Sequence, residues 1–319
     1  MKRTILALAA ALTVSALGIG TASAQAVITS GNVRLGVDRL GDLGVTGIGI
    51  TRTGVGDGIT PGCLCEGWGM SGNGIAGWVG NDNGGTVNVT GTAFASTAST
   101  ATASAQLTSL PTLRITQAYA PSASGDLFIN TVTITNFGAS AVSDVRYTRS
   151  MDWDIPPTEF AENVTIRRGG STALLFSNNN GFATPNPLAT PTSLCSFGAS
   201  TVNADFTDLG PCDHGAFFTF GFGSLAAGAS ITFNIFYGAS ESEAAALAAL
   251  GAVGAEVFSL GQNNRTATTT GIPATYIFAF SGVGGTPIGT VPEPGILALL
   301  GLGGLAMGFA ARRRKVAAA

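Results

Sequence analysis

The chain has 319 residues and a net charge of −3 at pH 7, and only 10% of its residues are charged. Its two lysines, Lys2 and Lys315, lie near the ends, so residues 25–290 contain nine arginines and 17 acidic residues and carry a net charge of −8. This acidic, lysine-free region argues against nucleic acid or an anionic membrane surface as a partner, because both bind clustered cations.

The first 24 residues have the features of a secretory signal peptide. Two basic residues precede an apolar run over residues 5–19, and an Ala-Ser-Ala cleavage site ends at Ala24. An uncleaved N-terminal anchor is the alternative. We expect residues 1–24 to direct export and the body of the protein to begin at Gln25.

Glycine (46 residues), threonine, serine and alanine favour short strands joined by tight turns over long helices. Residues 27–60 predict two or three strands, and the glycine-rich residues 57–70 predict an ordered loop that Trp68 and two cysteines attach to the body. Residues 86–109 alternate Thr or Ser with Ala or Val, which favours long edge strands. A disordered linker is the other reading of that run.

The exported body contains all four cysteines, an even number that predicts two disulfides in an oxidising compartment. Cys195 and Cys212 flank a polar loop and could close it, which leaves Cys63 and Cys65 as a short ring. Pairing one cysteine from each group is equally allowed. Zinc is a third reading, but the usual C-x₂₋₄-C spacing is missing.

The clearest strand pattern covers residues 126–137, and a turn at residues 136–140 predicts that residues 142–154 return antiparallel to it. On this returning strand, alternation places one set of side chains in the core and Asp152 and Asp154 together on the opposite face. The core set is Val145, Tyr147, Met151 and Trp153.

Four carboxylates lie within eleven residues at the end of this strand: Asp152, Asp154, Glu159 and Glu162. They could supply the oxygen ligands of a Ca²⁺ site, or an acid/base pair of the kind that cleaves glycosidic bonds. The structural reading, which we favour from sequence, is salt bridging with arginines that are close in sequence. These are Arg146, Arg149, Arg167 and Arg168.

The second half of the body predicts a phenylalanine-rich hairpin over residues 216–222 and 231–237. Ser240-Glu-Ser-Glu243 is a capping box that opens a helix over residues 241–250. A last strand at 275–280 precedes a flexible glycine-rich linker at 282–290. Together these elements predict an all-β fold, an antiparallel β-sandwich over residues 25–281 with one short helix.

Catalytic motifs are scarce. His214 is the only histidine, and a Ser-His-Asp triad would need it, but no G-x-S-x-G motif accompanies it. The phosphate-binding glycine motifs and H-E-x-x-H are also missing from the sequence. We therefore assign no catalytic residue and expect a protein that is not an enzyme and has no cofactor, with a Ca²⁺ ion at the four carboxylates as the alternative.

Residues 291–319 form a separate terminal segment. Residues 295–311 are an uncharged, mostly aliphatic run that would span roughly 25 Å as a helix, near the lower limit for crossing a bilayer. The basic end at 312–315 predicts a cytoplasmic C-terminus by the positive-inside rule. This segment therefore predicts a single transmembrane helix that anchors an exported body. The basic residues are Arg312, Arg313, Arg314 and Lys315.

The residues before this span are Val291, Pro292, Glu293 and Pro294, and the prolines predict an extended, accessible segment at the outer membrane surface. This motif, the short apolar span and the arginine-rich end resemble the PEP-CTERM sorting signal of Gram-negative bacteria. The resemblance implies that an exosortase, a membrane-embedded cysteine transpeptidase-like enzyme, recognises Pro-Glu-Pro and that the tail is then removed. A permanent C-terminal anchor is the alternative.

Proteins that resemble this one in the tail occur in bacteria that make exopolysaccharide. The resemblance implies a protein anchored transiently in the membrane and then released to the cell surface or extracellular matrix, with exosortase and exopolysaccharide as partners. A structural or adhesive role follows from it. The alternatives are a secreted carbohydrate-active enzyme and a calcium-dependent glycan-binding module, either of which would use the four carboxylates.

Overall fold

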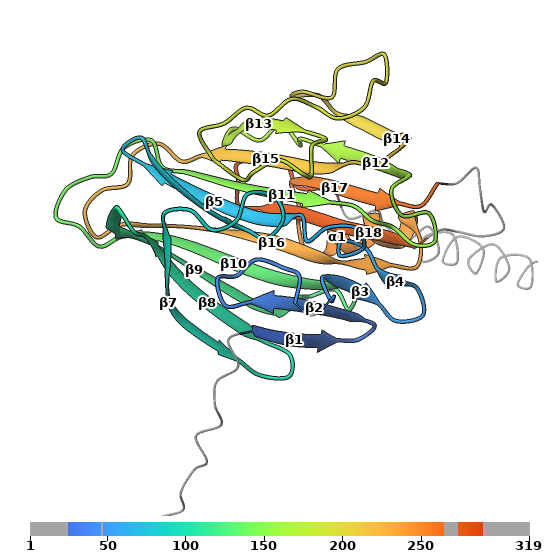
Figure 1. Ribbon diagram of the computed structural model, residues 1–319, viewed down its shortest axis with the longest axis horizontal. Helices are drawn as coiled ribbons and strands as arrows, with labels where there is room; N and C mark the ends of the chain where they lie inside the picture. Colours follow the sequence, from blue (N-terminus) through green and yellow to red (C-terminus); the bar gives the residue numbers. More distant parts are fainter. Residues whose placement is uncertain (1–24, 46, 265–273, 290–319) are drawn as a thin grey trace, which may run out of the picture.

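The computed structural model describes residues 25–45, 47–264 and 274–289 (Figure 1). These residues form 18 strands, all paired antiparallel in three sheets, and one helix, so the all-β prediction is confirmed. The expected signal peptide and terminal segment lie outside them. Within the described ranges, no helix combines the length and the apolar character needed to cross a membrane.

The largest sheet has nine strands in the order β14-β12-β17-β18-β16-β10-β9-β8-β7. The residues predicted as edge strands fall in β7, which is the last strand of this sheet, and in β8 beside it. The nine strands are β7 (Val89–Ser96), β8 (Ala101–Leu107), β9 (Leu110–Pro121), β10 (Leu127–Asn136), β12 (Glu162–Arg167), β14 (Phe206–Cys212), β16 (Ser230–Ser240), β17 (Val257–Gln262) and β18 (Thr275–Ser281).

A five-stranded sheet has the order β13-β15-β11-β5-β6, and a small four-stranded sheet runs from β1 to β4. The small sheet contains one strand more than the sequence predicted. Arg52 of β3 joins it to the nine-stranded sheet through a 2.6 Å hydrogen bond to the Ala239 carbonyl. These strands are β1 (Gln25–Ser30), β2 (Val33–Asp38), β3 (Ile50–Arg52), β4 (Gly56–Asp57), β5 (Glu66–Gly72), β6 (Ile75–Gly80), β11 (Arg146–Asp152), β13 (Leu174–Asn178) and β15 (Gly215–Gly221).

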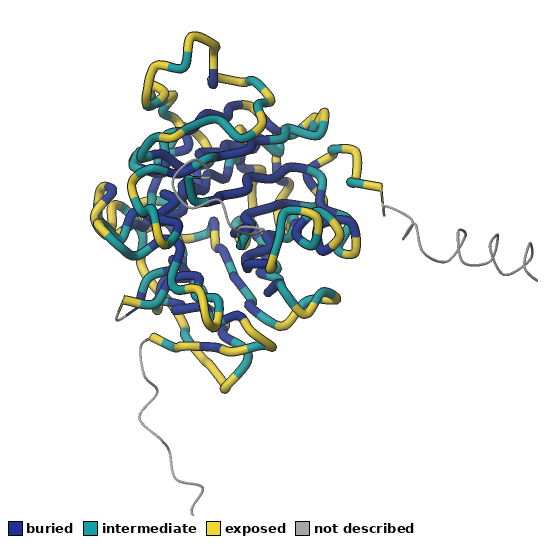
Figure 2. Tube along the Cα trace, turned by 90° about the vertical axis from the view of Figure 1, so that its right-hand side faces the viewer, coloured by how far each residue is buried: buried dark blue, intermediate teal, exposed yellow. Residues whose placement is uncertain are grey.

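The core lies where the five-stranded sheet packs on the inner face of the nine-stranded sheet. Phe220 of β15 lies 4.7 Å from Phe280 of β18 between ring centroids, and Tyr147 of β11 lies 5.0 Å from Phe233 of β16. Figure 2 shows the buried residues gathered in the middle of the molecule. These rings are among the largest fully buried side chains of the described residues, so they contribute a large share of the apolar area that the fold removes from water.

Both predicted hairpins are wrong in their pairing. β10 belongs to the nine-stranded sheet and β11 to the five-stranded one, and β15 and β16 are divided in the same way. The chain between each pair crosses from one sheet to the other. The Asn136 amide ties the two crossings together by donating to the Ser140, Leu225 and Ala226 carbonyls. Alternation in the sequence predicts which side chains face the core but carries no information on the neighbouring strand.

The loop predicted at residues 57–70 is only partly a loop, because Glu66–Gly72 is strand β5. Two glycines of this strand allow neighbouring backbone to approach closely. A Cβ on Gly69 would lie 2.0 Å from the Pro185 carbonyl oxygen, and one on Gly67 would lie 2.4 Å from that of Val79. Trp68, between them, is fully buried and donates its indole N–H to the Leu40 carbonyl at 2.9 Å.

The helix, α1 (Glu243–Ala252), begins two residues later than predicted. Ser242 caps it by accepting the Ala245 N–H, because the Ser240 hydroxyl instead donates to Asp126 at 2.7 Å. Its buried Ala246 and Leu250 belong to the apolar cluster on the outer face of the nine-stranded sheet. This helix therefore closes a second, smaller core.

The start of the predicted linker is attached to the body. The backbone N–H groups of Gly282, Val283 and Gly285 donate to the Glu256 carboxylate at 2.8–2.9 Å. Further along, the Ile288 N–H donates to the Ala255 carbonyl at 2.8 Å. The chain therefore stays packed on the fold as far as Ile288, and is not a free linker from residue 282 onwards.

Candidate metal centre

Three aspartates that come from two separate parts of the chain meet at one end of the five-stranded sheet. Asp152 ends β11, Asp154 follows two residues later, and Asp213 lies in the turn between β14 and β15. One carboxylate oxygen from each lies within 4.8 Å of the other two. We call these residues, together with Glu162, the carboxylate cluster.

The backbone on both sides of Trp153 fixes the direction of two of these side chains. The Asp152 N–H donates to the Cys65 carbonyl at 3.0 Å, and the Asp154 N–H donates to the Gly58 carbonyl at 2.8 Å. Trp153 points the other way, where its indole N–H donates to Ser259 at 3.0 Å in the core. Strand alternation thus places both aspartates on the same side, as the sequence predicted.

Glu162 belongs with the aspartates, whereas Glu159 does not. Glu162 begins β12, is fully buried, and accepts the Ile155 N–H at 3.3 Å through one oxygen, which holds its carboxylate beside Asp154. Neither glutamate is in the group of mutually close oxygens, but Glu162 is fully buried with an unpaired oxygen, whereas Glu159 is partly exposed. The sequence analysis included Glu159 in this group and omitted Asp213. The only signal in the sequence that could have identified Asp213 is its position between Cys212 and His214.

Most oxygens of the carboxylate cluster have no hydrogen-bond partner. One oxygen of Asp152, both of Asp154, one of Glu162 and one of Asp213 are buried without a donor. Asp152 and Asp154 are each 1% exposed, so their carboxylates have almost no contact with bulk water. Buried polar atoms are nearly always paired, and buried charges nearly always have a counter-charge.

The salt bridges predicted for these carboxylates are not formed in the described part of the chain. Arg146 pairs with Asp144 at 2.8 Å and Arg149 pairs with Glu66. Arg167 donates to the Thr207 hydroxyl, and Arg168 donates to the Asn203 carbonyl. The four arginines that are close in sequence therefore point to other partners.

Burial raises the pKa of every member, and the charges of neighbouring acids add to the rise for Asp152, Asp154 and Glu162. Burial is the largest cause for Asp152, whose pKa rises to about 10, and the charges of Asp154, Asp213 and Glu162 add to it. Burial, followed by neighbouring acids, raises the pKa of Asp154 to about 8, and burial likewise raises that of Glu162 to about 8. Burial also raises the pKa of Asp213. Four ionised carboxylates are therefore unfavourable here unless a cation joins them.

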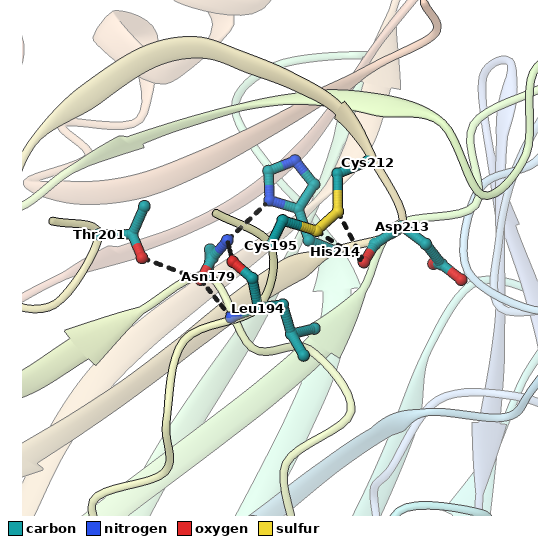
Figure 3. The surroundings of a disulfide bond; sticks show 7 residues. All are labelled: Asn179, Leu194, Cys195, Thr201, Cys212, Asp213 and His214. Carbon is teal, nitrogen blue, oxygen red and sulfur yellow. Dashed lines mark hydrogen bonds between the residues drawn. A yellow bond between two sulfur atoms is a disulfide. The ribbon is translucent and has the colours of Figure 1, made fainter. Parts of the chain in front are cut away.

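Each disulfide lies beside one residue of the carboxylate cluster. The bridges are Cys63–Cys65 and Cys195–Cys212, the first of the pairings that the sequence left open. The Cys63 sulfur lies 3.7 Å from an Asp152 carboxylate oxygen. On the other side, the Cys212 sulfur lies 3.5 Å from the Asp213 carbonyl oxygen (Figure 3).

His214, beside the second disulfide, is held as a neutral side chain by Asn179 (Figure 3). The Asn179 amide accepts the Leu194 N–H and donates to the Leu194 carbonyl, which fixes its orientation. Its NH₂ group therefore donates to His214 Nδ1 at 3.0 Å, so the ring proton lies on Nε2. Burial lowers the His214 pKa to about 4. An amide in this position gives none of the carboxylate support of a Ser-His-Asp triad.

A second buried charged group lies in the core between the sheets, and the sequence analysis missed it. Arg149 of β11 and Glu66 of β5 are both fully buried and form an ion pair. Glu66 also accepts the Leu43 N–H at 2.7 Å, and Arg149 donates to Gln117 at 2.8 Å and lies 5.4 Å from the centre of the Tyr237 ring. We call this the Arg149–Glu66 network.

Comparison with solved structures shows similarity to a putative aldose 1-epimerase from Escherichia coli K12. The two chains are 11% identical, with a TM-score of 0.34 over 83% of this chain and 92% of the other. Similarity at this level says nothing about activity. No curated protein matches the chain.

The terminal segment does match a known family model. The match is to the PEP-CTERM protein-sorting motif and covers residues 290–315, which includes the Pro-Glu-Pro sequence, the apolar run and the basic end. The chain is therefore a protein that carries a PEP-CTERM sorting motif at its C-terminal end.

Proposed function

We propose that this exported protein is a structural or adhesive component of the cell surface or extracellular polymer, and that its β body is not an enzyme. The sorting motif at residues 290–315, which implies export and processing by exosortase, is the observation that carries the proposal. Two disulfides in the described body suit an oxidising compartment outside the cytoplasm.

The burial of the carboxylates supports a non-enzymatic role. Acid/base cleavage of a glycosidic bond requires two carboxyl groups that contact the sugar on either side of the bond. Asp152 and Asp154 are each 1% exposed, and Glu162 is fully buried, so a polymer chain has no direct access to them. These residues are better suited to holding the body together than to cleaving a glycan.

The outer face of the nine-stranded sheet supports a neutral polysaccharide as partner. Ser104, Thr116, Thr133 and Thr232 occupy one register row across β8, β9, β10 and β16. All four are partly or fully exposed, and the Thr133 and Thr232 hydroxyls lie 3.1 Å apart. Hydroxyl groups both donate and accept hydrogen bonds, which suits an uncharged, polyhydroxylated surface.

Cell fractionation tests this proposal. A tag placed just before Val291 should be found with the surface or extracellular polymer in the wild-type host. It should stay in the inner membrane when the exosortase is deleted, and should pass into the medium when polymer synthesis is blocked. An unchanged distribution in the exosortase mutant would contradict processing.

Activity on the host's own polymer provides the second arm of this test. We expect no release of reducing sugar from the polymer by the wild-type protein. Release that the Asp152→Asn variant abolishes would contradict the structural role and support a carbohydrate-active enzyme instead.

A further inference from the structure

We propose that the carboxylate cluster binds one calcium ion, with Asp152, Asp154, Asp213 and Glu162 as its protein ligands. This inference is independent of the proposed surface role, since it depends only on the described body.

The carboxylate cluster has no positively charged partner among the described ion pairs. The described ion pairs of the chain are Arg52–Asp126, Arg146–Asp144 and Arg149–Glu66, so none of them includes a member of the cluster. Leaving several acids together in a buried position without a cation costs several kcal/mol per charge. A bound cation removes that cost.

Glu162 supplies a second, separate observation. Its side chain reaches the cluster from another strand, β12, and is completely buried. One oxygen is anchored by the Ile155 N–H, while the other has no partner. A buried carboxylate that is anchored at one oxygen and free at the other can supply a further ligand to an ion held by the three aspartates, whose oxygens are the ones within 4.8 Å of one another.

The spacing of the oxygens fits a single ion. Calcium binds oxygen ligands at about 2.4 Å, so two ligands on opposite sides of one ion lie up to about 4.8 Å apart. The three aspartate oxygens all lie within 4.8 Å of one another. They can therefore contact one ion together, and carboxylates that bind through both oxygens can raise the ligand number towards six to eight.

The donor set favours calcium over other cations. Every described cysteine is in a disulfide, and neither ring nitrogen of His214 is in the group of mutually close ligand atoms, so the thiolate and imidazole ligands that zinc prefers are missing from this group. Magnesium demands octahedral geometry and keeps several of its waters, which a site where Asp152, Asp154 and Glu162 are only 0–1% exposed does not readily hold. Calcium accepts irregular, nearly anhydrous oxygen coordination.

Metal binding and thermal unfolding of the full-length, disulfide-bonded protein in detergent test the proposal. After dialysis against EDTA, added CaCl₂ should raise the Tm by roughly 5–10 °C when free Ca²⁺ reaches 100 times its Kd. Equilibrium dialysis should give one bound Ca²⁺ per chain, and MgCl₂ at the same concentration should produce a smaller shift. A wild-type protein that binds no Ca²⁺ and shows no Tm shift would overturn the proposal.

Two isosteric variants test the choice of ligands. Asp213→Asn should weaken Ca²⁺ binding at least tenfold, because it removes a charged ligand from the partly exposed side of the site, where the fold tolerates change. Glu159→Gln is the matched control, since it lies between the other acids in sequence but outside the cluster, and it should bind Ca²⁺ like the wild type. Loss of binding in Glu159→Gln with normal binding in Asp213→Asn would refute the proposed ligand set.

Discussion

Strand β11 contributes one residue to each of two groups of buried ionisable side chains, and the two groups differ in whether the buried charge has a partner. Arg149 points into the core and pairs with Glu66, while Asp152, three residues later, faces the carboxylate cluster. In the Arg149–Glu66 network the fold supplies its own cation, and no polar atom of either side chain lacks a partner. In the cluster, oxygens remain unpaired. The first group is complete within the chain, whereas the second has no counter-charge among the described ion pairs.

The largest loss of stability should come from breaking the Arg149–Glu66 network. Arg149→Met should lower the free energy of unfolding by about 3–5 kcal/mol, because Glu66 would be left buried without its cation. Urea unfolding of the full-length protein measures this. Arg146→Met is the control, since its pair with Asp144 is exposed, and should cost under about 1 kcal/mol. Equal losses in the two variants would mean that Arg149 contributes no more than a surface charge.

The second-largest effect should come from removing the Cys195–Cys212 disulfide, which lies beside the carboxylate cluster. Replacing both Cys195 and Cys212 with serine opens a bridge that spans 17 positions, which should cost about 3 kcal/mol. It should also weaken Ca²⁺ binding, because Asp213 follows Cys212 directly and would lose its fixed position. Thermal unfolding with and without Ca²⁺ measures both quantities. A Ca²⁺-induced Tm shift equal to that of the wild type would show that the bridge does not position Asp213.

A smaller, pH-dependent effect tests the edge of the Arg149–Glu66 network. Asp42 is 2% exposed, accepts one hydrogen bond from Asn81, and has a second oxygen without a partner. Burial, with Asp38 and Glu66 nearby, raises its pKa to about 8. Between about pH 4 and pH 8 the folded state therefore holds a proton that the unfolded state releases, so stability falls as the pH rises, by up to about 1.4 kcal/mol per pH unit.

The Asp42→Asn variant removes this contribution. Its stability relative to wild type should increase steadily from pH 5 to pH 7 and level off above pH 8. Urea unfolding at each pH measures the difference. Parallel stability curves for the two proteins would show that Asp42 titrates normally and that Arg149 neutralises it after all.

Sequence reasoning predicted local structure better than partners. The alternation in residues 126–137 gave β10 nearly to its ends, and it placed Asp152 and Asp154 on one face correctly. It paired β10 with the wrong strand because the period of a strand is the same in either sheet. Glu159 was grouped with the other acids because it is near in sequence, whereas Asp213 reaches them only through the turn between β14 and β15.

The partner of Arg149 could not be predicted for the same reason, because it is distant in the sequence. Its neighbours in the sequence suggested a partner among the acids that follow, but its partner Glu66 lies 83 positions earlier, on the adjacent strand β5. An arginine in the middle of a core-facing strand is a signal that a buried acid must exist somewhere. It does not say which one, since the pairing depends on sheet order.

The attachment of residues 282–288 determines how mechanical load enters the fold. Tension applied at the C-terminal side, whether through a membrane anchor or through whatever a processed end is joined to, first meets the hydrogen bonds of Ile288 to Ala255 and of Thr286 to Gly169. It then meets the three hydrogen bonds on Glu256. Glu256 immediately precedes β17, which lies between β12 and β18, so a pull is delivered to an inner strand. Inner strands resist peeling because both edges are bonded, which is an advantage for a tethered protein exposed to shear.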